Sequence, residues 1–206
     1  MAGSARRVTK DGEARGCRTA GGAASPAGPA SRGHGPAYRG RSIAVYAEEV
    51  ALPNGRRVTL DIVRHPGASA VVPFASAGEV LLIRQYRHAA GGTIYEVPAG
   101  KLDGAEDPAV CAARELEEET GWRAGRLERL GEIWTTPGFT DERIHLFAAF
   151  DLAPAPQRLE DDEIIEVVRV SLARALEMIW SGELRDAKSA LALLHAAHRA
   201  GRLGPA

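Results

Sequence analysis

The chain has 206 residues, a formal net charge of −1, and 45% hydrophobic and 26% charged residues. This length allows one domain with a sizeable core, and the composition is ordinary for a globular protein. The near-neutral charge excludes a global attraction to nucleic acid or to an anionic membrane, and no apolar run approaches the ~20 residues of a membrane span. The two cysteines, Cys17 and Cys111, cannot form a disulfide framework, which favours a reducing, cytoplasmic location.

Composition divides the chain into a predicted disordered N-terminal tail, residues 1–40, and a folded domain, residues 41–202. The tail is rich in Gly, Ala, Ser, Pro and Arg and has almost no large apolar residues. Such a segment cannot bury enough surface to offset the entropy of ordering. Because arginines outnumber acids in it, a transit peptide is the alternative interpretation. We expect activity without this tail.

The first half of the folded domain has the pattern of strands. Apolar and polar residues alternate over residues 42–52 and 57–64, and the Pro-Asn-Gly sequence at 53–55 predicts a turn between them. Runs of β-branched and apolar residues predict further strands at 69–74, 79–86 and 93–97, the last of which ends at Pro98-Ala99-Gly100.

A helix is predicted at residues 107–120. Asp107 can cap it, Pro108 suits its first position, and Gly121 suits its C-terminal end. Strands at 127–135, 144–152 and 164–170 and amphipathic helices at 172–181 and 187–200 follow. This order predicts a mixed α/β domain with a sheet packed on helices.

One face of this central helix is acidic. Glu115, Glu118 and Glu119 stand at i, i+3 and i+4 and therefore share a face, where their charges repel one another. A divalent cation removes this repulsion, and hard oxygen ligands select Mg²⁺, with Mn²⁺ as a substitute. For the carboxylates taken alone, a solvated acidic surface is the alternative.

The residues around the acidic face form a longer motif. The segment from Gly100 to Trp122 matches the Nudix box, G-x5-E-x7-R-E-U-x-E-E-x-G-U with U bulky and apolar, at every fixed position. The chain thus resembles the Nudix hydrolases, which makes residues 41–202 a Nudix hydrolase domain. The resemblance implies a mixed β-sheet sandwiched between α-helices, an α/β/α sandwich, and a loop-helix-loop that holds metal against a diphosphate.

The same resemblance assigns roles within the motif. It implies that Glu115 and Glu119 are direct metal ligands, that Glu118 is a direct or water-mediated ligand, and that the carbonyl of Ala99 also coordinates. Arg114 would orient the carboxylates. From the preceding loop, Glu106 would support the helix.

Features outside the motif resemble the ADP-ribose pyrophosphatase subfamily. Pro137 lies sixteen residues after Gly121, and segments 85–87 and 95–100 also resemble that subfamily. The resemblance implies that Arg87 contacts the diphosphate, and that Glu96 and Glu142 contact the terminal ribose or organise the site. A turn at Pro137 is expected whatever the substrate, and GDP-mannose hydrolases share much of this pattern.

An acidic loop at residues 160–166 supplies the candidate base. In similar enzymes a glutamate from this loop faces the metals as base or ligand, and alignment of the following apolar strand favours Glu163. Glu160, Asp161 and Glu166 are the alternatives. Glu166 shares a strand face with Ile164, so it also has a route to the site.

The resulting expectation is a Mg²⁺-dependent hydrolase that converts ADP-ribose, a nucleoside diphosphate sugar, to AMP and ribose 5-phosphate. Similar enzymes are homodimers, which implies a homodimer here. Tyr46, or an aromatic residue from a partner subunit, is a candidate for stacking on the adenine. A non-catalytic ADP-ribose-binding regulator and a purely structural module are the competing classes. The intact Arg114, Glu115, Glu118 and Glu119 argue against the first, and the second requires the whole motif to arise by chance.

Overall fold

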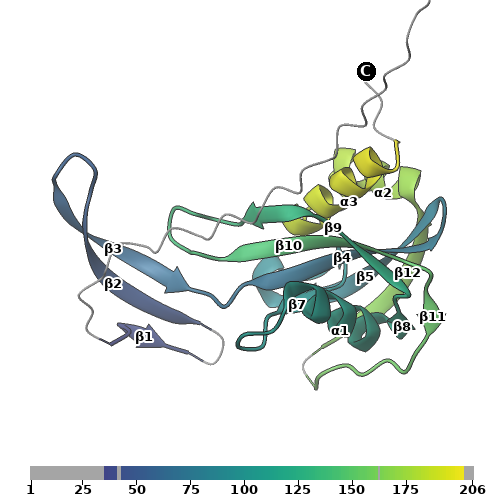
Figure 1. Cartoon of the computed structure of the whole chain (residues 1–206), viewed down its shortest axis with the longest axis horizontal. Coiled ribbons are helices and arrows are strands. Elements are labelled where there is room, and N and C mark those ends of the chain that lie inside the picture. Colours follow the sequence, from purple (N-terminus) through teal and green to yellow (C-terminus); the bar gives the residue numbers. More distant parts are fainter. Residues whose placement is uncertain (1–34, 41–42, 162, 202–206) are drawn as a thin grey trace, which may run out of the picture. The chain divides into compact units, whose positions relative to one another are not determined.

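The computed structural model describes residues 35–40, 43–161 and 163–201. Contacts divide the chain into Met1–Ala30 and Ser31–Ala206, and every described residue belongs to the second unit. The predicted tail up to residue 34 lies outside the described residues. The elements of Figure 1 are β1 (Tyr38–Arg39), β2 (Ala44–Ala51), β3 (Arg57–Arg64), β4 (Ala68–Ser76), β5 (Glu79–Arg87), η1 (His88–Ala90), β6 (Gly92–Glu96), β7 (Ala99–Lys101), α1 (Pro108–Thr120), β8 (Trp122–Arg123), β9 (Arg126–Trp134), β10 (Arg143–Phe150), β11 (Ala153–Pro154), β12 (Ile165–Ser171), α2 (Leu172–Trp180) and α3 (Ala187–Arg199).

The central helix forms where the sequence predicts it. The Asp107 side chain accepts a hydrogen bond from the Ala109 N–H at 2.8 Å, and Gly121 ends the helix with a φ of 71°. The long predicted strands and both C-terminal helices also form, with ends shifted by one or two residues.

Four short strands were not predicted: β1, β7, β8 and β11. A strand of two or three residues is too short to have a detectable alternation. Strand β1 lies in the last residues of the predicted tail, where Tyr38 and Arg39 pair with Val45 and Ala44 of β2. Strand β7 begins at Ala99, which the sequence analysis placed at the end of a strand.

The main sheet of the described residues has seven strands, with β12, β5, β4, β10 and β9 in that order. Strands β4 and β10 are parallel, whereas the other pairs are antiparallel. Strands β4 and β5 pair only near their shared turn, at Phe74 and Ser76. Beyond this point β6 pairs with β5 and β7 pairs with β4, so residues 92–101 lie where the two central strands separate.

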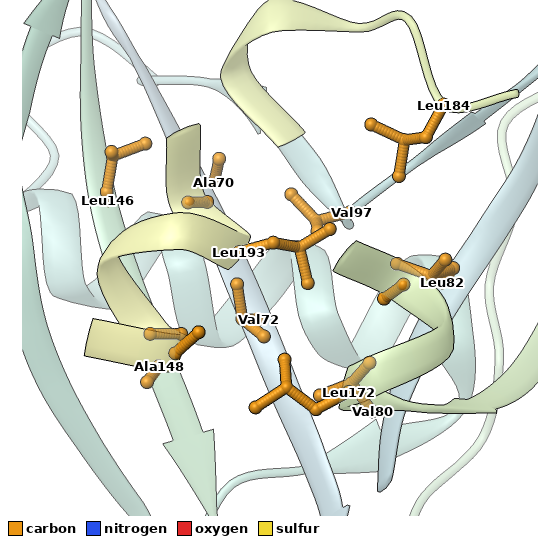
Figure 2. Close-up of a cluster of buried hydrophobic side chains, with 14 of the residues drawn as sticks. Ala70, Val72, Val80, Leu82, Val97, Leu146, Ala148, Leu172, Leu184 and Leu193 are labelled. Carbon is orange, nitrogen blue, oxygen red and sulfur yellow. The ribbon is translucent and has the colours of Figure 1, made fainter. Parts of the chain in front are cut away.

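Helices cover both faces of this sheet, as predicted. Along β4, Ala70 and Val72 belong to a core cluster with α2 and α3, whose members include Leu193 (Figure 2). The intervening Val71 packs instead with Leu116 of α1. Successive side chains of a strand point to opposite faces, so this alternation confirms the α/β/α sandwich.

The β2–β3 hairpin joins the loop between β9 and β10. Val63 forms a parallel bridge with Thr140, and the Asp141 carboxylate accepts hydrogen bonds from the Arg64 side chain at 2.8 Å and the His65 N–H at 2.9 Å. These contacts hold the open end of the hairpin against the loop between β9 and β10. Among the described residues, no helix is long and apolar enough to cross a membrane.

Candidate functional site

A pocket of about 740 Å³ lies where α1, the β6–β7 segment and the start of α3 meet. Its lining brings together residues that are distant in the sequence. The predicted site residues that line it are Arg87, Ala99, Arg114, Glu115, Glu118, Glu119, Glu142 and Glu163. Glu96 and Pro137 do not line it.

Glu119 is the most deeply placed carboxylate of the α1 wall, with 2% of the residue exposed. Burial, followed by the charge of Glu115, raises its pKa well above the ordinary value. Its Oε2 atom accepts a hydrogen bond from the Ala99 N–H at 3.0 Å. Helix α1 is thereby tied to β7, with the Ala99 amide directed at the helix.

Glu115 is buried against the backbone of Gly100. A methyl group on Gly100 would lie 1.9 Å from the Glu115 Oε1 atom, so the glycine is required by close approach rather than by a left-handed φ. Burial raises the pKa of Glu115 to about 7, although the Arg114 charge opposes this. Gly121, in contrast, does have a left-handed φ.

Arg114 connects the acidic face to the loop before the helix. Its Nη1 donates to Glu115 at 2.7 Å and to Glu118 at 3.1 Å, while Nε and Nη2 donate to Glu106 at 3.1 and 3.0 Å. One guanidinium therefore holds three carboxylates, and it provides positive charge where they would otherwise repel one another.

The donor set of this wall fits a hard divalent cation. Glu115, Glu118 and Glu119 provide carboxylate oxygens from one helix face, and hard oxygen ligands of this kind suit Mg²⁺. Within the described residues, no group of three ligand side chains is already arranged as a metal cage. Arg114 bonds one oxygen of each neighbouring carboxylate, Oε1 of Glu115 and Oε2 of Glu118.

A second charged cluster faces the pocket from β5 and α3. Arg87 forms two hydrogen bonds with Glu96, at 2.7 and 3.0 Å, and Lys188 also bonds this carboxylate. Lys188 reaches Asp186, the cap of α3, at 3.0 Å. Burial alone would raise the pKa of Glu96, but the hydrogen bonds and charges of Arg87 and Lys188 lower it.

Glu96 is therefore an internal anchor, with 1% of the residue exposed, rather than a group on the pocket surface. Lys188 and Asp186 were not among the predicted site residues. Asp186 has a local signal, since it precedes the predicted helix at 187–200 as a cap residue. No local pattern links Lys188 to Glu96, which lies 92 positions away.

Of the two predicted site residues in the β9–β10 loop, Glu142 lines the pocket and Pro137 does not. Glu142 lines it and accepts a hydrogen bond from the Thr135 hydroxyl at 2.8 Å. Pro137 lies in an exposed turn, in which the Thr136 carbonyl accepts from the Phe139 and Thr140 N–H groups at 3.2 and 3.1 Å. The turn expected at Pro137 is therefore present. Pro137 itself does not line the pocket.

The acidic loop places two of its candidate bases at the pocket, Glu163 and Glu160. The Glu163 carboxylate accepts from the Glu160 N–H at 2.8 Å, and its charge adds to the raised pKa values of Glu115 and Glu119. Glu166 forms an ion pair with Arg84 at 2.6 Å instead, and does not line the pocket.

The aromatic side chain in the pocket lining is Trp134, and Tyr46 is not part of that lining. Trp134 is 49% exposed, and the Arg143 guanidinium stacks on its ring with its central carbon 4.3 Å from the ring centroid. One feature of the sequence could have identified Trp134 as a candidate: it lies at the end of a predicted strand, directly before the loop that contains Pro137.

Comparisons with protein families, known sequences and solved structures give consistent results. The model of the NUDIX domain matches residues 63–191. An ADP-ribose pyrophosphatase of Bacillus subtilis is 43% identical over 153 residues, 73% of this chain and 83% of the relative. A methanol dehydrogenase activator of Bacillus methanolicus is 39% identical, over 74% and 84% of the two chains.

A GDP-mannose pyrophosphatase of Escherichia coli is 39% identical over 140 residues, 63% of this chain and 72% of the relative. The fold also resembles a solved ADP compounds hydrolase with a TM-score of 0.72 and 24% identity, over 82% of this chain and 93% of the other. The match to the family model and the complete motif from Gly100 to Trp122 lead to one conclusion: the chain belongs to the Nudix hydrolase family.

Proposed function

We propose that this protein is a Mg²⁺-dependent pyrophosphatase that hydrolyses ADP-ribose to AMP and ribose 5-phosphate. The observation that carries the proposal is the pairing of two walls in one pocket. Buried carboxylates of α1, Glu115 and Glu119, lie on one side, and Arg87 and Lys188 lie on the other. The names of the relatives from Bacillus subtilis and Escherichia coli support a nucleoside diphosphate sugar as substrate, with GDP-mannose as the alternative.

Glu115, Glu119, Glu118 and the Ala99 carbonyl would hold the cation, with Mn²⁺ as a substitute. Bound there, Mg²⁺ supplies positive charge to the diphosphate and lowers the pKa of a bound water. Oxygen ligands of this type suit a hard cation. Arg114 keeps the carboxylates oriented through the hydrogen bonds described above.

The remaining chemistry belongs to residues around the substrate. Arg87, fixed by two bonds to Glu96, presents its remaining N–H groups to the phosphates. Glu163 takes the proton of the attacking water. The water oxygen bonds to one phosphorus, the bond from that phosphorus to the bridging oxygen breaks, and the bridging oxygen leaves with the other phosphate, whose charge Arg87 stabilises.

Trp134 replaces Tyr46 as our candidate for stacking on the nucleobase, because its exposed ring lines the pocket. Glu142 is proposed to contact the terminal ribose. The turn at Pro137 is proposed to shape that end of the pocket.

We further propose a homodimer in the cytoplasm. Ile43 and His65, which flank the open end of the β2–β3 hairpin, line the pocket, so a partner that packs on this hairpin would influence the site. Exposed Tyr38 and Leu60 provide apolar surface on the same sheet. The free buried thiol of Cys111 is compatible with a reducing compartment.

The test is a hydrolysis assay with ADP-ribose, GDP-mannose, NADH, diadenosine polyphosphates and 8-oxo-dGTP, with Mg²⁺ and with EDTA. We expect AMP release from ADP-ribose that EDTA abolishes. Glu119→Gln should lower kcat by at least about 100-fold with folding intact. Glu117→Gln is the matched control, since Glu117 lies on the same helix but bonds Arg123 at 2.8 Å outside the pocket.

Each result has a distinct meaning. Preference for GDP-mannose would reject only the substrate. No turnover of any diphosphate, together with tight binding of ADP-ribose, would favour the non-catalytic regulator. Equal activity of the Glu119→Gln and Glu117→Gln variants would show that the metal site is wrong.

A further inference from the structure

Gln85 is a buried polar residue that the mechanism above does not use. It follows the apolar run of β5, and 4% of the residue is exposed. Its side-chain oxygen Oε1 is buried, and none of the described residues donates a hydrogen bond to it. A buried amide oxygen without a donor lowers stability, and such groups are rare in folded proteins. The side chain therefore calls for a donor that comes from outside the protein.

The pocket provides the place for this donor, because Gln85 is part of its lining. Gln85 and Arg87 are two positions apart on β5, so their side chains share one face of the strand at a spacing of roughly 7 Å. On the other side, Gln85 pairs with Ile165 of β12, two residues after Glu163. Gln85 thus lies on the strand of the residue proposed to bind phosphate, and its pairing partner on β12 closely follows the proposed base in the sequence.

The chemistry of the amide oxygen indicates which reactant it binds. It accepts hydrogen bonds and does not donate them. The attacking water has two hydrogens, and the diphosphate has none at neutral pH. A water that donates one hydrogen to Glu163 and the other to Gln85 has its lone pairs free, directed away from both acceptors.

We propose that Gln85 is a positioning residue that orients the attacking water together with Glu163. This inference rests on the proposed hydrolase function. When the water oxygen bonds to phosphorus, one proton passes to Glu163, and the hydrogen held by Gln85 stays on the oxygen and leaves with the product phosphate. Gln85 gains and loses no proton.

The proposal predicts opposite effects on stability and on catalysis. Gln85→Met keeps the length of the side chain and removes the unpaired oxygen, so the melting temperature should equal or exceed that of the wild type, by up to roughly 4 °C. The same variant should lower kcat by at least about tenfold and leave KM within twofold, because substrate binding is untouched. Gln85→Leu is a second variant with the same expectation.

Gln157 provides the matched control. Its side-chain nitrogen donates to the Glu119 carbonyl at 2.7 Å, so Gln157→Met removes a bond that is made and should lower the melting temperature. Kinetics use whichever substrate of the panel the wild type turns over best, so a wrong substrate assignment does not affect this test.

Two results would overturn the role of Gln85 while the hydrolase function stands: kcat within threefold of the wild type in both Gln85 variants, or a lower melting temperature with kcat and KM both changed. The second result would mean that the amide is structural. Inactivity of the wild type on every substrate would instead reject the hydrolase function, and this role with it.

Discussion

Gly100→Ala tests the close approach between β7 and α1. The new methyl group would lie 1.9 Å from Glu115 Oε1, whereas ordinary contact begins at 3.4 Å, so the carboxylate must move by about 1.5 Å. This movement breaks the 2.7 Å bond from Arg114, worth about 1.5–3 kcal/mol as a charge-assisted hydrogen bond. The clash is with the end of a flexible side chain, so we expect a net loss of about 1–3 kcal/mol and an intact fold.

The effect on activity should be larger than the effect on stability. A displacement of about 1 Å at a catalytic group can lower the rate about 100-fold, so kcat/KM should fall by at least that factor. The Mg²⁺ concentration for half-maximal activity should rise, because a proposed ligand has moved. Thermal unfolding should show a decrease of about 2–4 °C per kcal/mol.

The assay is AMP release across a Mg²⁺ titration, with circular dichroism on the same samples. Gly92→Ala is the control, since Gly92 also lies in a short strand of the sheet and a methyl group there meets no atom within 4 Å. If Gly100→Ala keeps kcat/KM within threefold of the wild type at the same Mg²⁺ concentration, the close approach of Gly100 to Glu115 is not needed for activity.

Three further predictions follow from the pocket and the sheet. Arg87→Lys keeps the charge but loses the paired bonds to Glu96, so kcat/KM should fall roughly tenfold or more in steady-state assays; an unchanged value would mean that the paired geometry is unimportant. Trp134→Ala should raise KM about tenfold through lost stacking, and Tyr46→Ala should not; the reverse pattern would restore Tyr46 as the stacking residue. Burial is the main cause that lowers the pKa of His145 below its ordinary value of 6.5. The unfolded chain then binds the proton more readily, so stability is lost as pH falls through 6.5, and urea unfolding at pH 7.5 and 5.5 should show a smaller difference in His145→Gln than in the wild type.

The sequence by itself determined the features whose signals are local. The cap at Asp107, Pro108 at the first helical position and Gly121 at the end place α1 within one turn of its observed limits, because all three act on adjacent backbone groups. The continuous apolar runs at 69–74 and 79–86 predict buried strands of the main sheet, whereas its two covered faces were implied only by the resemblance to the Nudix hydrolases. The spacing of the motif also places the acidic residues on one helix face.

The tertiary structure decided which of these residues share one pocket. Glu96 was expected either to contact the terminal ribose or to organise the site, and its bonds to Arg87 and to Lys188, 92 positions later, make it a buried anchor. The requirement for Gly100 comes from the carboxylate of Glu115 and not from its own φ. The unpaired oxygen of Gln85 is likewise visible only when β12 and β6 pair with β5 on its two sides. Such contacts join residues far apart in the chain, and the order of strands in the sheet, which no local pattern encodes, brings them together.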